Sequence, residues 1–125
     1  MGYEVVWEQP AGVIKRHFGL VTGRDLLGAV RETEGDSRFD TLRYVINDFR
    51  DCTGLAVSPA EVQEIAALDG AAARTNPRIR IAVVTDLPEV MATAKAYADD
   101  PLTPFVTRVF ASMEEARRWV REGAS

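Results

Sequence analysis

L-A-V-S-P-A-E-V, residues 55–62, joins the end of an apolar run to the start of a helix and decides the fold. The hydroxyl of Ser58 can accept a hydrogen bond from a free backbone N–H of the first helical turn. Glu61, three residues further on, can bond back to the backbone N–H of Ser58 and lies at the positive end of the helix dipole. Pro59 suits the first helical position. The stretch therefore predicts a helix that Ser58 opens, shortly after a strand.

The same combination of an apolar run and a capping signature occurs three more times. It reads T-G-R-D at residues 22–25, D-L-P-E at residues 86–89 and S-M-E-E at residues 112–115. Each begins with a side chain that can cap a helix and has an acid three residues on. A repeated order of strand, cap and helix is typical of a wound α/β domain.

Short apolar segments between these signatures predict five strands. The first two are joined by the turn residues 9–12, Q-P-A-G, which favours an antiparallel hairpin. We therefore expect one α/β domain over residues 1–125, with a five-stranded mixed sheet wound in sequence order and an antiparallel first edge strand. A loop is expected over residues 51–57. The predicted strands are residues 3–8, 13–20, 43–49, 78–84 and 105–111.

The strands alternate apolar and polar residues, whereas parallel strands covered on both faces are usually apolar throughout. We therefore expect helices mainly on one face of the sheet. The other face would carry several basic side chains, Lys15 among them, either as a solvated surface or as a contact for an acidic partner. His17, the only histidine, is expected to be a surface strand residue without partners for a triad or a zinc site.

Composition excludes several classes of protein. The net charge of −4 argues against nucleic acid as a partner, because binding to phosphates needs a basic surface. No apolar run approaches the ~20 residues of a membrane span, and no signal peptide is recognisable at the N-terminus. Cys52 is the only cysteine, so an intrachain disulfide is impossible and a cytoplasmic location is the simplest expectation.

Five stretches together resemble the SpoIIAA-like family of small bacterial proteins, which have a STAS-like fold. They are residues 19–26, 38–49, 55–62, 78–85 and 108–120. Antagonist-type STAS domains have a phosphorylatable serine at the start of the helix after the third strand, and they bind a partner kinase with that surface. The resemblance implies a comparable site in this chain. Ser58 occupies the comparable place and Asp48 matches the acidic residue that closes the strand. Val57 and Pro59 depart from the family motif.

Ser58, Asp48 and Asp51 are therefore the candidate partner site or phosphosite. As a structural residue, Ser58 is simply a helix cap. Asp48 and Asp51 follow a strand, at the carboxyl edge where open α/β sheets bind ligands, although turn-building is the commoner use of aspartate. A metal site or an acid/base pair would need further partners, so no metal, cofactor or catalytic set is predicted.

The helix over residues 88–99 is the second candidate region. Val90, Met91, Ala94 and Tyr97 form its apolar face, and two prolines in the loop that follows prevent the helix from continuing. Its ordinary role is core packing. The alternative is a lid over an apolar ligand pocket, or a segment that touches a membrane. The SpoIIAA-like family is also similar in shape to the CRAL-TRIO lipid-transfer fold, which implies such a pocket.

The leading functional expectation is a non-enzymatic binding module that acts through contact with a protein partner. The first alternative is a binder of a lipid or another small apolar ligand, gated by the helix over residues 88–99, with possible peripheral membrane contact. An enzyme is the third alternative. A homodimer is also expected, because the first strand and Trp7 would offer an exposed apolar edge.

Overall fold

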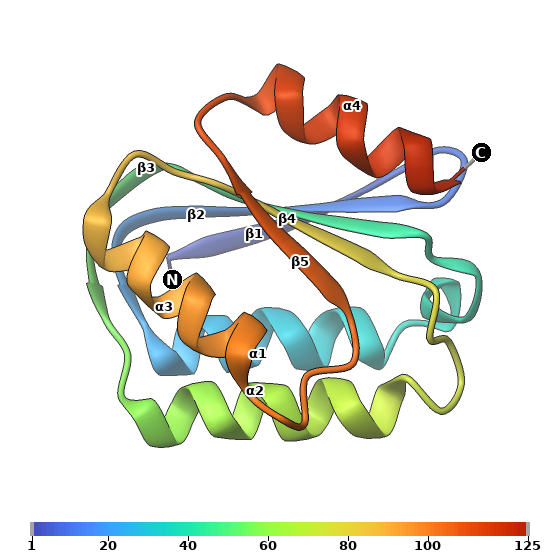
Figure 1. Ribbon diagram of the computed structural model, residues 1–125, viewed down its shortest axis with the longest axis horizontal. Coiled ribbons are helices and arrows are strands. Elements are labelled where there is room, and N and C mark those ends of the chain that lie inside the picture. Colours follow the sequence, from blue (N-terminus) through green and yellow to red (C-terminus); the bar gives the residue numbers. More distant parts are fainter. Residues whose placement is uncertain (1, 125) are drawn as a thin grey trace.

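A five-stranded sheet forms the centre of the protein, whose computed structural model describes residues 2–124 (Figure 1). The strands lie side by side in the order β1-β2-β3-β4-β5, and only the β1–β2 pair is antiparallel. The predicted order and the antiparallel edge are thus confirmed. The strands are β1 (Tyr3–Glu8), β2 (Gly12–Thr22), β3 (Tyr44–Ala56), β4 (Arg80–Val84) and β5 (Val106–Phe110).

Three helices cover one face of the sheet and a fourth crosses the other face (Figure 1). The layer of three consists of α1 (Gly23–Glu34), α2 (Pro59–Ala72) and α3 (Pro88–Asp99), and α4 (Met113–Ala124) lies opposite. A short 3-10 helix, η1 (Ser37–Thr41), follows α1. Within residues 2–124, no helix combines the length and the apolar character needed to cross a bilayer.

Three of the four predicted helix starts are confirmed. The hydroxyls of Thr22, Ser58 and Ser112 each accept a hydrogen bond from the backbone N–H three residues on. The prediction for Asp86 is wrong: Leu87 is the residue that precedes α3, and no side chain caps that helix. Asp86 is exposed, and the hydroxyl of Thr85 accepts from Leu87 N instead, at 3.0 Å.

The third strand is longer than the sequence predicts. The loop expected over residues 51–57 is wrong for most of its length, because β3 continues to Ala56. β2 continues as well, to Thr22, and the two strands stay paired beyond register shifts on either side of Gly19. Gly19 has φ of +69°, a left-handed conformation that glycine adopts without steric cost. The polar residues at the end of β3 are typical of a loop, but pairing with β2 keeps them in a strand.

The sheet separates two hydrophobic cores. The core under α1–α3 is the larger one and includes Val13, Val45 and Phe49 from the sheet. The core under α4 contains Ile46, Val84 and Trp119. Helices therefore lie mainly on one face, as expected.

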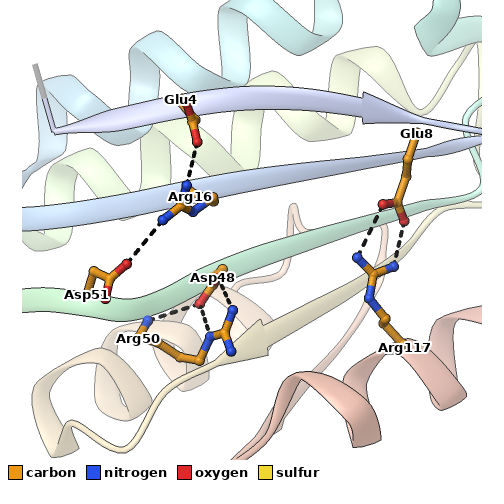
Figure 2. Close-up of polar contacts among 7 residues, drawn as sticks. All are labelled: Glu4, Glu8, Arg16, Asp48, Arg50, Asp51 and Arg117. Atoms are coloured by element: carbon orange, nitrogen blue, oxygen red, sulfur yellow. Dashed lines mark hydrogen bonds and ion pairs between the residues drawn. The ribbon is translucent and has the colours of Figure 1, made fainter.

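The α4 side of the sheet is only half covered. On that side Val6, Phe18 and Leu20 remain exposed, and we call these three residues the open face. The expectation of Lys15 on this side is wrong, because Lys15 is buried under the three-helix layer; the basic residue of β2 that does lie here is Arg16, and acids neutralise it (Figure 2). Arg16 contacts both Glu4 and Asp51, at 2.7 and 3.2 Å.

Candidate functional site

The Ser58 corner is built as a helix start. Ser58 Oγ accepts from Glu61 N at 3.1 Å, and Ser58 N donates to Glu61 Oε1 at 2.9 Å. Ser58 is exposed and Glu61 is partly buried. A phosphate on Ser58 would stand against the Glu61 carboxylate, so the local electrostatics favour capping over phosphorylation.

Asp48 does not join Ser58. It is buried in the middle of β3 and forms a bidentate ion pair with Arg50. Arg50 Nε and Nη2 each lie 2.9 Å from a carboxylate oxygen (Figure 2). Burial opposes ionisation of Asp48, but the hydrogen bonds from Arg50 outweigh it and leave the pKa of Asp48 lowered. Both oxygens of the Asp48 carboxylate are thus engaged by Arg50 within β3.

Asp51 lies apart from Ser58 as well. Six residues lie between the two, most of them in extended β3, which corresponds to a distance of roughly 20 Å. The Asp51 carboxylate is paired with Arg16 (Figure 2). Among the described residues, no group of three or more histidine, cysteine, aspartate or glutamate side chains could hold a metal ion.

A cavity of about 110 Å³ lies between the sheet and the layer of α1, α2 and α3. Its walls are mostly apolar and include Val30, Val62 and Ile81 from three different elements. Of the four predicted pocket residues on α3, Val90, Ala94 and Tyr97 line the cavity. Met91 is not part of the lining; its side chain is exposed, 41%, because it points to the outer side of α3.

One end of the cavity is polar. Asp69 on α2 is buried and accepts a hydrogen bond from the hydroxyl of Tyr97 on α3. Glu34, at the end of α1, shares a side-chain hydrogen bond with Asp69, and burial together with that bond raises the pKa of Glu34 to about 9. Burial, with the Asp69 carboxylate, also raises the pKa of Tyr97. At neutral pH, the Glu34 carboxyl and the Tyr97 phenol are therefore neutral.

Lys15 reaches the same cavity from β2. Its side chain is only 7% exposed. Burial lowers the pKa of Lys15, and the carboxylates of Asp69, Glu34 and Glu32 act against this fall. Within residues 2–124, the Lys15 amino group forms no hydrogen bond or close ion pair with another side chain, so its N–H donors are unused.

His17, two residues along β2, points into the cavity beside Lys15. It is 1% exposed, which corrects the expectation of a surface residue. Its ring stacks on Phe49 with centroids 4.4 Å apart and planes 13° apart. His17 Nε2 lies 3.1 Å from Asn47 Oδ1, while Nδ1 is buried with no partner in the described part of the chain. Burial lowers the pKa of His17 to about 4, so the imidazole is neutral.

Sequence reasoning missed this group because it assigned Lys15 and His17 to a solvated face. One signal was available. Asp69 shares a helix face with Val62 and Ala66, and a carboxylate on an apolar stripe needs a buried partner. Tyr97, on the apolar face of the next helix, supplies that partner.

The overall fold is similar to three solved structures. The anti-sigma factor antagonist SpoIIAA in its unphosphorylated form matches with a TM-score of 0.63 at 13% identity, over 95% of this chain and 97% of that chain. SpoIIAA described as a Bacillus cell fate determinant, in the phosphorylated form, matches with a TM-score of 0.59 at 16% identity, over 95% and 99%. An uncharacterised protein of the DUF3478 family from Shewanella loihica PV-4, with a SpoIIAA-like fold, gives 0.58 at 13%, over 94% and 91%.

The chain therefore has the SpoIIAA-like fold that the resemblance of its sequence predicted. At these identities the likeness concerns the fold alone. No protein-family model matches the sequence, and no curated protein matches it.

Proposed function

We propose that this chain is a binding module, and not an enzyme, which takes a small apolar molecule into the cavity under α1–α3. The cavity itself is the observation that carries the proposal. Small-molecule sites are typically concave and mostly apolar, with a few convergent polar groups. The walls here are of that kind, and Lys15 and His17 supply the polar groups.

The size of the cavity sets the class of ligand. An apolar cavity of about 150 Å³ is enough to hold benzene. At about 110 Å³, the space suits a molecule near that size and is far too small for a whole membrane lipid. Of the expected ligands, a lipid or another small apolar molecule, the cavity therefore favours the small molecule.

The chemistry of the lining favours binding over turnover. Asp69, Glu34 and Tyr97 are committed to one another, and Asn47 holds His17. Among the described residues of the lining there is no serine or cysteine to act as a nucleophile. Cys52 lies elsewhere in the core, and burial raises the pKa of its thiol, which keeps it unreactive.

Benzene provides the test. In a titration of the ¹⁵N-labelled protein, we expect saturable shifts of backbone signals from β2, α1 and α3. Ala94→Leu fills the cavity from α3 and should weaken benzene binding about tenfold or more. Ala96→Leu adds the same volume on the exposed side of the same helix and should change nothing. If no saturable shifts appear in the wild-type protein, or if both variants behave alike, the proposal fails.

Contact with a protein partner is the second candidate function, and the open face favours it. Phe18 and Leu20 are 40% and 62% exposed on a sheet surface that α4 leaves bare. The adjoining charges are already paired, since Arg16 binds Glu4 and Asp51. A largely apolar surface with neutralised charges suits another protein better than it suits an acidic or basic polymer.

A further inference from the structure

The buried Nδ1 atom of His17 lacks a hydrogen-bond partner in the described structure, and it identifies the ligand more closely than the cavity volume does. Because Asn47 Oδ1 is an acceptor, the Nε2–H of His17 donates to it at 3.1 Å. The neutral ring therefore carries its lone pair on Nδ1. A buried acceptor without a partner costs free energy, so the position is suited to a molecule that brings a donor.

The amino group of Lys15 supplies the complementary group. Lys15 and His17 are two residues apart on β2, so their side chains leave the strand on the same face and enter the same cavity. The amino group of Lys15 has N–H donors, and the imidazole has a lone pair that accepts. A single group that both donates and accepts would satisfy the two side chains together.

We propose, building on the binding function above, that the cavity takes a small, neutral, largely apolar molecule that carries one hydroxyl group. The hydroxyl donates its hydrogen to His17 Nδ1 and accepts a hydrogen bond from Lys15 Nζ. The apolar body lies among the walls formed by Val30, Ile81 and Val90. Phenol has the chemistry and about the size that this arrangement requires.

Two other ligand classes fit less well. A carboxylate would accept from Lys15, but it would set its own lone pairs against His17 Nδ1 and its charge near Asp69. A plain hydrocarbon would fill the apolar part and leave both polar groups without partners. The site should therefore rank ligands in the order phenol, hydrocarbon, carboxylate.

A series of four probes tests the inference on the wild-type protein. Phenol has both a donor and an acceptor, anisole keeps the oxygen acceptor without the O–H, toluene has neither, and benzoate has a charge. Dissociation constants are measured by NMR titration at pH 7. We expect phenol to bind about tenfold more tightly than anisole or toluene, the difference that one buried hydrogen bond can make, and benzoate to bind most weakly.

Two variants assign the preference to its residues. Lys15→Met keeps an apolar stem, and His17→Phe keeps a ring that can stack on Phe49. Each should bring phenol to the level of toluene while toluene binding changes little. If toluene binds the wild type as tightly as phenol, the hydroxyl preference is overturned and the binding function stands. If none of the four probes binds, both proposals fall.

Discussion

Two side chains of β2 show how the interior keeps polar groups. Burying a charge is costly unless a partner offsets it. Lys15 has that partner at longer range in Asp69, and His17 avoids the cost by staying neutral. The residues are thus compatible with the core only as part of the group that Asp69, Glu34 and Tyr97 complete.

The protonation of His17 gives the prediction at this scale. Burial disfavours the imidazolium, and the pKa of His17 in the folded protein is lowered to about 4 from its usual 6.5. Neutral His17 therefore contributes stability above pH 6.5, and this contribution is lost as the pH falls toward 4. Because the chain has one histidine, its Cε1–H signal in proton NMR is unambiguous and should titrate near pH 4.

The same signal in urea-unfolded protein is the control and should titrate near pH 6.5. A midpoint near 6.5 in the folded protein would mean that the ring is in contact with solvent. The cavity would then be wet, and His17 Nδ1 would already have water as its partner.

Among the elements, α3 is the least firmly held helix of the three-helix layer. No side chain caps its start, and its buried residues are Val90 and Ala94. By contrast, α2 has a full capping box at Ser58, although both helices have a proline in the first turn. A helix with few buried contacts and an uncapped end opens at a lower free energy than its neighbours.

Hydrogen exchange tests this difference. Amides of α3 should exchange at least about tenfold faster than those of α2, which corresponds to an opening free energy lower by about 1.4 kcal/mol. Saturating phenol should slow the exchange in α3 more than in α2, because Val90, Ala94 and Tyr97 line the cavity. Equal protection of the two helices would contradict the view of α3 as the movable wall.

The sequence predicted those elements well that depend on interactions between residues close together in the chain. Thr22 and Ser58 reach only three residues ahead, and both helices begin there. Asp86 has the same signal but does not cap α3, because the hydroxyl of Thr85 accepts the hydrogen bond from Leu87 N instead. β3 was cut short because its continuation depends on pairing with β2, a partner more than 30 residues away in the chain.

At the scale of the whole molecule, the two faces of the sheet are unequal. Three helices seal one face, whereas α4 leaves the open face of Val6, Phe18 and Leu20 exposed (Figure 1). Trp7 was expected to contribute to an exposed apolar edge, but its side chain is partly buried. It packs against the larger core, and the Arg38 guanidinium lies 4.3 Å from its ring centroid. The apolar surface proposed for association is therefore the open face, on β1 and β2.

Self-association through this surface is the prediction that follows. In sedimentation equilibrium at roughly 100 μM protein, we expect a reversible dimer to be detectable. This corresponds to a dissociation constant of the dimer in the micromolar range. Leu20→Asp should abolish the dimer, because a carboxylate would be buried without a partner.

Leu102→Asp is the matched control. Leu102 is 58% exposed in the loop after α3, away from the open face, and its substitution should leave the dimer intact. A wild-type protein that stays monomeric at this concentration would rule out the homodimer.

The candidate site was predictable only in part, for the same reason of scale. Val90, Ala94 and Tyr97 were expected at a pocket because helical spacing places them on one side. Lys15 and His17 were not, since alternation along a strand shows that two residues share a face but not which layer covers it. Three helices, distant in sequence, decide that β2 turns these two residues inward.

One strand thus faces two ways: Lys15 and His17 point into the molecule, and Arg16 between them points outward to Glu4 and Asp51. Deleting a single amino acid early in this strand, either Val13 or Ile14, would invert this arrangement, placing a guanidinium in the apolar interior and the imidazole outside. The chain is consequently intolerant of length changes within β2, whereas the 100–104 connection has room to drift in length over evolutionary time.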